Sequence, residues 1–455
     1  MIQKNDKIQL HIESISSDGS GVGRYDNLVI FTPMTCAGDD ILAHILKVKK
    51  SYAFAKVEKM ITPSPDRIEP DCAVYRQCGG CAFRHMRYES ELREKQRMVD
   101  DALARIGTLS LRTEEILALS PLRYRNKAQY PLREQDGKIQ AGFFAKHSHR
   151  VIGCEDCLLE PEIFGRITQA VIFFLKEKGI SVYDEERHAG LVRHIFLRST
   201  SDEQVALCLV LNGTALPKQS EFVRFMSASF PQIKSIALNF NTAKTNVILG
   251  KKFQTVFGTD TIEDKLLGKR FAISPASFYQ VNHDMCEKLY RKVAEYAGLQ
   301  EGETLLDVYC GAGTIGICTA KENTRLIGVE IVPQAVENAK INAALNGMEN
   351  AEFLCADAGK ATDILKQRGI KADCVIIDPP RKGCDERTIE NVAAFGASRL
   401  VYVSCNPSSL ARDLKRFEEK GYRAVRACAA DMFPRTAHCE VIALLTRELR
   451  SDMNS

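Results

Sequence analysis

Apolar runs of strand length alternate with helix-forming stretches throughout the chain after residue 300. Five runs are expected to be strands: LLDVYC (305–310), RLIGVE (325–330), AEFLCAD (351–357), DCVIID (373–378) and RLVYVSC (399–405). The expected helices are TIGICTAKE, PQAVENAKINAALNG, KATDILKQR and PSSLARDLKRFEEK. Because apolar strands separated by helices are typical of a parallel sheet covered on both faces, we predict an α/β domain over residues 266–455.

A glycine-rich turn links the first of these strands to the first helix. Gly311, Gly313 and Gly316 fit the pattern G-x-G-x-x-G, in which small residues let the backbone approach a ligand closely. Glu330 ends the next strand, 19 residues after Gly311, where a carboxylate can accept hydrogen bonds from both hydroxyls of a ribose. The pattern fits NAD or S-adenosylmethionine (SAM), and it also fits an ordinary turn that binds no ligand.

Two further carboxylates favour SAM. Asp357 ends the third expected strand, where it can meet the edge of an adenine, and Asp378 ends the fourth, in VIIDPPRKG. Such residues form a polar rim where open α/β sheets bind ligands. The turn carries no basic residue for a pyrophosphate, and SAM has no pyrophosphate. The DPP motif also occurs in enzymes that methylate exocyclic amino groups of bases, but there an aromatic residue follows the prolines, whereas Arg381 follows here.

Cys405 ends the last expected strand, and a helix is predicted to begin just after it. Asn406 can cap that helix, and Pro407 suits its first position. A thiol beside a helix N-terminus lies near the positive end of the helix dipole, which favours the thiolate. Cys405 is therefore a candidate nucleophile, and the alternative is a buried structural cysteine.

A thiolate next to SAM suits methylation of a pyrimidine at C5. That carbon is a poor nucleophile until a thiolate adds to C6, and the C5 proton must afterwards be removed by a general base. The segment DMFPRTAHCEVIALL (431–445) offers Glu440 as that base, just before a predicted strand, and His438 as a positioning residue. The alternative for Glu440 is a solvated carboxylate at the end of a strand.

Six segments together resemble the TrmA/RumA-type RNA (uracil-5-)-methyltransferases. They are SPASFYQVN (274–282), LDVYCGAGTIG, GVE, IDPPRKG, VSCNPSSLARD and TAHCEVIALL. The resemblance implies a Rossmann-like SAM-dependent methyltransferase domain, in which Cys405 adds to uracil C6 and Glu440 takes the C5 proton. It also implies a set of SAM contacts, which are Gln280, Tyr309, Glu330 and Asp378.

The first 60 residues contain short strands punctuated by Gly and Asp, which indicates a five-stranded barrel of the OB type. This barrel is similar to the TRAM module with which such enzymes hold RNA. The linker TPSPDRIEP (62–70) follows it. Residues 61–265 are predicted to form an α+β RNA-binding domain, with helices over 89–106 and near 161–178. Its expected strands are AGFFA, HIFLRS, QVALCLVL, SIALNF and TNVILG.

Three cysteines lie close together in CAVYRQCGGC (72–81). The spacing of Cys72, Cys78 and Cys81 lacks the second C-x2-C of a zinc ribbon, and three clustered thiols with one distant thiol suit a [4Fe–4S] cluster. Cys154 and Cys157 are the candidates for the distant ligand. The ribosomal-RNA branch of the family carries a cluster with this pattern, and the resemblance assigns the fourth position to Cys157. Zinc and unligated thiols are the alternatives.

The cysteine pattern directs the expected substrate toward 23S ribosomal RNA, because the tRNA branch of the family generally lacks this cluster. We expect methylation of a uridine in a single-stranded loop, with the target uracil flipped into the pocket. The alternatives are the same chemistry on tRNA, an NAD-dependent dehydrogenase, and an RNA-binding protein with an inactive catalytic half.

The segment PLRYRNKAQYPL (121–132) mixes basic and aromatic residues, which suits phosphate contacts and base stacking. These residues are Arg123, Tyr124, Arg125, Lys127 and Tyr130. An amphipathic strand with a solvated charged face fits the segment equally well.

We expect a cytoplasmic protein, and we expect a monomer because nothing in the sequence suggests a coiled coil. The N-terminus MIQKNDKIQL lacks the apolar core of a secretory signal, and the run AVIFFL (170–175) is too short to span a membrane. The 16 cysteines are therefore expected as thiols or ligands rather than disulfides. The net charge of +4 favours RNA binding only weakly, so any basic surface must be local.

Overall fold

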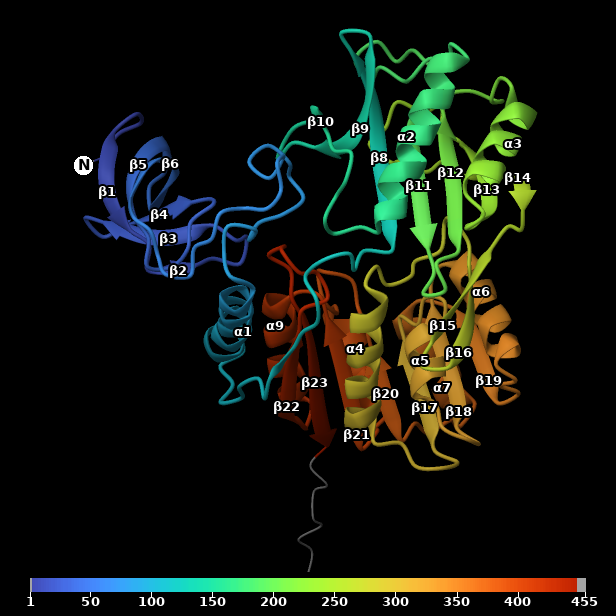
Figure 1. Ribbon diagram of the computed structural model, residues 1–455. Helices are drawn as coiled ribbons and strands as arrows, with labels where there is room; N and C mark the ends of the chain where they lie inside the picture. The colour runs from blue at the N-terminus through green and yellow to red at the C-terminus, as the bar shows by residue number, and fades with distance from the viewer. Residues whose placement is uncertain (1, 448–455) are drawn as a thin grey trace, which may run out of the picture.

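Within residues 2–447, the part of the chain that the structure describes apart from the side chains of residues 362 and 366, three large β-sheets follow one another. Figure 1 shows their arrangement in the computed structural model, with the central sheet next to the C-terminal sheet and the N-terminal sheet to one side. No helix in this part of the chain is long and apolar enough to cross a membrane.

The N-terminal sheet has six strands, whereas five were expected. They are β1 (Lys7–His11), β2 (Ser14–Ile15), β3 (Gly21–Tyr25), β4 (Leu28–Thr32), β5 (Asp40–Val48) and β6 (Tyr52–Thr62), in the order β1-β5-β6-β4-β3-β2. The expected strand KIQLHIESI is split into β1 and β2. The split arises because the N–H of Ile12 donates to Asp39 O while the N–H of Glu13 donates to Val22 O, which moves the chain from one neighbouring strand to another.

The central sheet has seven strands, and two helices cover one of its faces. The strands are β8 (Lys127–Gln135), β9 (Lys138–Phe144), β10 (Val151–Gly153), β11 (Val192–Ser199), β12 (Val205–Leu211), β13 (Ile233–Phe240) and β14 (Lys252–Gly258), in the order β10-β9-β8-β11-β12-β13-β14. The helices α2 (Glu162–Glu177) and α3 (Gln219–Ser229) bury Phe164, Val171 and Phe222 in one core with Leu197 and Leu207 of the sheet.

The segment TNVILG (245–250) is a loop, so its prediction as a strand is wrong. Asn241 Nδ2 donates to Val247 O (2.7 Å) and Ile248 O (3.0 Å), and Gly250 N donates to Asn239 Oδ1 (2.7 Å). Side-chain amides therefore satisfy backbone groups that a strand would have paired with a neighbour.

The C-terminal sheet is mixed, although the sequence predicted a parallel one. Its strands are β7 (Ile116–Leu117), β17 (Thr304–Val308), β18 (Arg325–Glu330), β19 (Ala351–Cys355), β20 (Cys374–Ile377), β21 (Arg399–Ser404), β22 (Tyr422–Ala430) and β23 (Glu440–Arg447), in the order β19-β18-β17-β20-β21-β23-β22-β7. The first five in this order are parallel, and β23 is antiparallel to β21 and β22. The connection 431–439 between β22 and β23 is too short for a crossover, so these two strands pair as a hairpin.

Helices cover both faces of this sheet, as predicted. One face packs against α4 (His283–Ala297), α5 (Thr314–Thr319) and α6 (Pro333–Leu345), and the other packs against α7 (Ala358–Gln367), α8 (Glu386–Ala394) and α9 (Pro407–Glu419). The helices α3, α4 and α8 were not predicted. A hairpin of β15 (Ile262–Leu266) and β16 (Lys269–Ile273) precedes α4.

The helix predicted over 89–106 is α1 (Tyr88–Arg105), and it packs on the C-terminal sheet although it precedes the central sheet in the chain. Its residues Val99 and Leu103 are buried with Leu410, Leu414 and Phe417 of α9. The strand β7 follows α1 and pairs with β22 at the edge of the same sheet. Figure 1 shows α1 beside α9.

Candidate active site at the carboxyl edge of the C-terminal sheet

The glycine-rich turn between β17 and α5 is held by two carboxylates. Asp307 Oδ2 accepts a hydrogen bond from Gly316 N (2.9 Å), and Glu330 Oε2 accepts one from Gly311 N (3.1 Å). Gly311 and Gly313 have φ angles of 54° and 79°, which favour glycine. A Cβ atom on Gly316 would lie 2.8 Å from Asp307 Oδ2. Asp307 was not predicted as a site residue; its signal is an acidic residue inside an apolar strand that leads into the turn.

Four of the predicted SAM contacts lie at the ends of four adjacent strands. Tyr309 follows β17, Glu330 ends β18, Asp357 lies just beyond β19, and Asp378 follows β20. Because these strands are parallel neighbours, the structure brings the four residues to one edge of the sheet. Gln280 comes from the loop before α4, and its backbone O accepts a hydrogen bond from Asn126 Nδ2 (3.0 Å).

Each of these side chains has its own surroundings. Glu330 Oε1 accepts from the N–H groups of the next two residues (2.8 and 2.9 Å), so backbone donors fix both of its oxygens. Asp357 is exposed, and its Oδ1 accepts from Gly359 N (3.0 Å). Tyr309 is partly buried with φ 66°, and burial raises the pKa of its phenol to about 12.

Cys405 and Glu440 meet across two neighbouring strands. In the antiparallel pair β21–β23, Ser404 is opposite Val441, so the next residues outward are Cys405 and Glu440. The carboxyl end of β21 and the amino end of β23 therefore place the predicted nucleophile and the predicted base at the same edge as Asp378. Glu440 is buried and Cys405 is partly buried, so the solvated alternative for Glu440 does not hold.

Three acidic side chains at this edge, those of Cys405, Glu440 and Asp378, have raised pKa values, so each keeps its proton to a higher pH than usual. Burial, followed by the charges of Glu440 and Asp378, raises the pKa of Cys405 to about 11, and Arg381 opposes this shift. Burial and the charge of Asp378 raise the pKa of Glu440 to about 8, and burial raises the pKa of Asp378 to about 7. The expectation of a thiolate at Cys405 is therefore wrong for the free protein, because burial and two nearby carboxylates outweigh the helix N-terminus.

The helix cap after Cys405 is formed as predicted. Asn406 Oδ1 accepts from Ser408 N (3.0 Å), and Pro407 is the first residue of α9. Asn406 Nδ2 and Ser409 Oγ both donate to Arg381 O (3.0 and 3.2 Å). The cap thus ties the IDPPRKG segment to the turn that carries Cys405.

His438 lies against Arg381, whose Nη2 donates to His438 Nε2 (3.2 Å). Burial, followed by the charges of Arg381 and Lys95, lowers the pKa of His438, so its imidazole is neutral and can accept this bond. The ring lies edge-to-face on Phe433, with centroids 6.1 Å apart. A positioning role for His438 stays a prediction.

A family model described as tRNA (Uracil-5-)-methyltransferase matches residues 87–448. The chain belongs to this family. A second model, for the TRAM domain, matches residues 3–57, which confirms the predicted N-terminal module.

Relatives of this methyltransferase share its full length. An uncharacterized RNA methyltransferase of Halalkalibacterium halodurans is 41% identical over 447 residues, which cover 98% of both chains. One of Listeria monocytogenes is 42% identical over 450 residues, again 98% of both chains. The crystal structure of Pyrococcus abyssi tRNA (uracil-54, C5)-methyltransferase in complex with S-adenosyl-L-homocysteine has a TM-score of 0.78 at 27% identity, over 96% of this chain and 99% of that chain. The prediction of an RNA methyltransferase is confirmed.

A buried network of charges fixes the segment of the methyltransferase that leads to Glu440. Lys95 Nζ on α1 donates to Glu91 Oε1 (2.8 Å), Asp431 Oδ1 (2.6 Å) and Phe433 O (3.2 Å). Arg435 donates to Glu91 from its backbone N (2.7 Å) and from Nη1 (3.2 Å). The two cations balance the two carboxylates, so the segment 431–435 is held to α1. This network was not predicted from the sequence.

Five thiols of the methyltransferase come together from two segments: Cys72, Cys78, Cys81, Cys154 and Cys157. A hydrogen bond from Cys154 lowers the pKa of Cys157 to about 7, while burial and then the charge of Cys157 raise the pKa of Cys78. Among residues 2–447, no group of three or more His, Cys, Asp or Glu side chains is arranged to hold a metal ion. The iron–sulfur site therefore stays a prediction.

Arg84 lies beside these thiols. It is 2% exposed, its Nη1 donates to Asp71, and its Nη2 is buried with no hydrogen-bond partner among the described residues. Burial raises the pKa of Cys81 to about 12, and the charge of Arg84 opposes this shift. A buried cation with a free donor suits an anionic group bound by the thiols.

Several residues of PLRYRNKAQYPL already form hydrogen bonds or ion pairs with other residues of the chain, so they do not form the RNA surface that was expected. Arg123 pairs with Asp156 and donates to two backbone carbonyls. Tyr124 donates to Pro434 O (3.0 Å), and buried Tyr130 donates to Glu160. Only Arg125 and Lys127 keep the expected role open.

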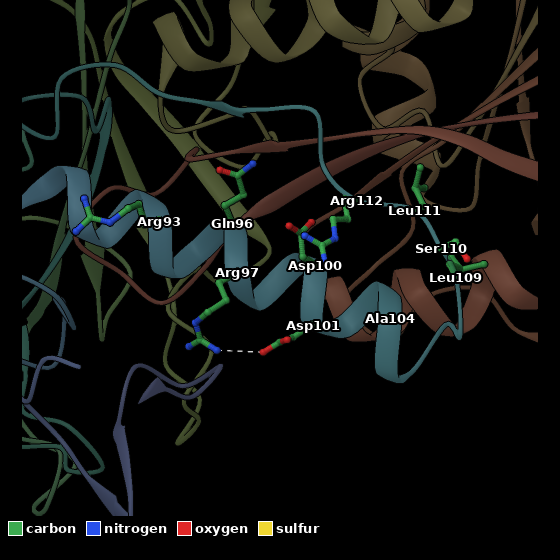
Figure 2. Close-up of a pocket in the computed structure, with 10 residues that line it drawn as sticks. All are labelled: Arg93, Gln96, Arg97, Asp100, Asp101, Ala104, Leu109, Ser110, Leu111 and Arg112. Atoms are coloured by element: carbon green, nitrogen blue, oxygen red, sulfur yellow. Dashed lines mark hydrogen bonds and ion pairs between the residues drawn. The ribbon is translucent and has the colours of Figure 1, made fainter. Parts of the chain in front are cut away.

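A pocket of about 600 Å³ lies between α1 and residues 109–112, and none of the predicted site residues lines it (Figure 2). Most of its charged groups have hydrogen-bond partners in the pocket or beside it. Arg97 Nη1 donates to Asp101 (3.0 Å), and Asp100 Oδ1 accepts from Thr113. The pocket therefore contributes nothing to the site at the sheet edge.

Proposed function

We propose that this methyltransferase transfers the methyl group of SAM to C5 of a specific uridine in 23S ribosomal RNA and forms 5-methyluridine. The observation that carries the proposal is the meeting of Cys405 and Glu440 across β21 and β23, at the edge where the glycine-rich turn ends. A thiol and a buried carboxyl side by side suit addition to a pyrimidine ring followed by removal of its proton.

The proposed SAM site combines a glycine turn with carboxylates. Glu330, Tyr309, Gln280, Asp357 and Asp378 would hold the ligand, and the left-handed glycines let the backbone come close to it. The residues fit, because the turn offers carboxylates and no cation, which suits a ligand with a positive charge and no phosphate. Bound SAM would supply an electrophilic methyl group on a cationic sulfur.

In the proposed mechanism, Cys405 gives its proton to solvent water and its sulfur bonds to C6 of uracil, which pushes the electron pair toward C5. C5 would take the methyl group that bound SAM supplies, and SAM would leave as S-adenosylhomocysteine with the electron pair of the broken S–CH₃ bond. Glu440 then accepts the proton from C5, the C6–S bond breaks, and the sulfur leaves as thiolate. Because its pKa is about 8 in the free protein, Glu440 must first lose its own proton, and as a carboxylate it is then a stronger base than an ordinary glutamate.

RNA with 5-fluorouridine at the target position tests this mechanism, because fluorine cannot leave as a proton. With SAM present, we expect a covalent protein–RNA complex that survives denaturation. Cys405→Ala should form no complex and should still bind S-adenosylhomocysteine as tightly as the unaltered protein. An adduct in the Cys405→Ala protein, or none in the unaltered protein, would overturn the mechanism.

The cysteine pattern supports ribosomal RNA as the substrate. The second candidate is tRNA, which the family's name and the Pyrococcus abyssi enzyme favour. Mapping 5-methyluridine in 23S ribosomal RNA and in tRNA from a deletion strain separates the two. Loss from 23S ribosomal RNA alone is the expected result, and loss from tRNA alone would transfer the proposal to tRNA.

We also propose a [4Fe–4S] cluster on Cys72, Cys78, Cys81 and Cys157. The convergence of the thiols and the buried donor of Arg84 support it. The proposed role is to hold the segments around 72–81 and 154–157 together, since ligand binding to a folded site stabilises the fold. A monomer in the reducing cytoplasm completes the proposal.

A further inference from the structure

Two cations that form no ion pair with any described residue lie opposite each other on the central sheet. Lys127 of β8 is directly opposite Arg198 of β11 in the antiparallel ladder, so their side chains lie on the same face. Both lie near the ring of Phe196, with Lys127 Nζ 6.0 Å and Arg198 Cζ 5.9 Å from its centroid. Arg125, two residues before Lys127, adds a third positive charge.

Arg198 carries unused donors in a buried position. It is 1% exposed, and its Nη2 donates to Ser277 O (2.9 Å), whereas Nε and Nη1 are buried with no partner in the described part of the chain. Asp264, whose charge acts on Arg198, uses its Oδ1 for three donors from Ser201 and Lys265, and its Oδ2 is buried with no hydrogen-bond partner among the described residues. Within residues 2–447, neither Lys127 nor Arg198 forms an ion pair.

The charges of Arg198 and Arg125 disfavour the charged form of Lys127. Burial, then Arg198, then Arg125 lower the pKa of Lys127 to about 8. Burial lowers the pKa of Arg198 to about 10, although Tyr279 and Asp264 oppose this shift. Such a group costs free energy in the free protein, and an anion placed among the cations would remove that cost.

The cations lie next to the predicted active site. Asn126, between Arg125 and Lys127, donates from its backbone N to Val281 O (2.8 Å) and from Nδ2 to Gln280 O (3.0 Å). Asn282 in turn donates to Met432 O (3.1 Å), in the segment that leads to Glu440. The loop that contains Gln280 and Val281 also carries Phe278, which is 74% exposed.

We propose that Arg125, Lys127 and Arg198 bind a backbone phosphate of the RNA beside the target uridine. The inference rests on the proposed function in that RNA is the substrate. A phosphodiester supplies the missing negative charge, and a guanidinium with two free N–H donors suits its oxygens. A neutral base edge would leave the repulsion between the cations in place.

The test is Lys127→Gln, with Lys176→Gln on the exposed side of α2 as the matched control. Binding of a fluorescein-labelled single-stranded RNA is measured by anisotropy over a series of KCl concentrations. Lys127→Gln should weaken binding several-fold and reduce the slope of log K against log salt by about 0.7, the value for one lost phosphate contact on a single strand. Lys176→Gln should change neither quantity, and an unchanged slope for Lys127→Gln would overturn the proposal.

Two further measurements separate this site from a structural role. Without RNA, Lys127→Gln should unfold at the same temperature as the unaltered protein or a higher one, because repulsion is removed; a marked fall would make Lys127 a structural residue. Arg198→Lys, which keeps the charge and loses the fork of donors, should weaken binding at an unchanged slope. If Lys127→Gln reduces the slope as expected while the unaltered protein forms no 5-methyluridine, the proposed function fails while the phosphate site stands.

Discussion

The ammonium group of Lys95 lies 2.6 Å from a carboxylate oxygen of Asp431, although 336 positions separate the two residues in the chain. Both side chains are fully buried. The contact joins α1 to the segment that leads into β23 and Glu440. The position of the proposed base therefore depends on a helix from the first quarter of the chain.

Lys95→Met should destabilise the protein by about 3–5 kcal/mol, because it leaves Asp431 as an unpaired buried charge. It should also lower kcat, since the segment before Glu440 loses its anchor. Denaturant unfolding and single-turnover methyl transfer measure the two effects. The double variant Lys95→Met with Asp431→Asn removes the lone charge, and it should regain most of the stability. A single variant with an unchanged kcat would show that the network does not position Glu440.

Glu440→Gln should block release of the product rather than attack by Cys405. Glutamine cannot take the C5 proton, so the covalent complex should accumulate on ordinary uridine-containing RNA. Turnover should fall by about 10²- to 10⁴-fold, the usual contribution of a general base. Denaturing gels and rapid quench of labelled SAM measure both quantities, and normal turnover in this variant would exclude Glu440 as the base.

The raised pKa of Glu440 also predicts how stability depends on pH. A carboxyl whose pKa is about 8 when folded and near its ordinary value when unfolded stabilises the fold at low pH, and this contribution is lost as the pH rises to 8. Glu440→Gln removes that loss. Its melting temperature should therefore exceed that of the unaltered protein by at least about 2 °C at pH 9 and match it near pH 4. An advantage that is equal at both pH values would contradict the assigned pKa.

Two serine variants decide which thiol completes the proposed cluster. Cys157→Ser should lose iron and sulfide, about four of each per chain, together with the visible absorbance of the cluster. Cys154→Ser should keep them, and Cys355→Ser, which alters an exposed thiol of β19, is the matched control. Iron retained in Cys157→Ser and lost in Cys154→Ser would assign the fourth position to Cys154. Unaltered protein that contains zinc and no iron would refute the cluster.

Much of the sheet edge was predictable because local sequence determines it. Glu330, Asp357 and Asp378 each close an apolar run, and parallel strands bring such ends to one edge. Glu440 depended on more than this, because its approach to Cys405 requires β23 to run antiparallel in a fixed register. Periodicity does not specify that register. Glu440 was instead predicted from the sequence motifs around it.

Other features depend on contacts that no local pattern encodes. The protonation of Cys405 depends on carboxylates from two other strands, and the charge network depends on residues hundreds of positions apart. The helix α4 could have been predicted, because Asn282 is a recognisable helix-start signal: its side chain caps the helix by accepting from Met285 N (3.2 Å). The prediction of a strand at 245–250 was wrong because asparagine side chains there form hydrogen bonds that a neighbouring strand would otherwise form.

The two residues of β7 form the outer margin of the catalytic sheet, and the whole central sheet is threaded into the chain between them and β17. A polypeptide beginning at residue 266 would lack that margin and the helix that shields α9, and would present β22 as an open edge prone to self-association. The chain from residue 266 onward is therefore not expected to fold as an independent domain. Recombination between relatives within this stretch would separate parts that have to fit each other, so the central and C-terminal sheets are expected to be inherited together.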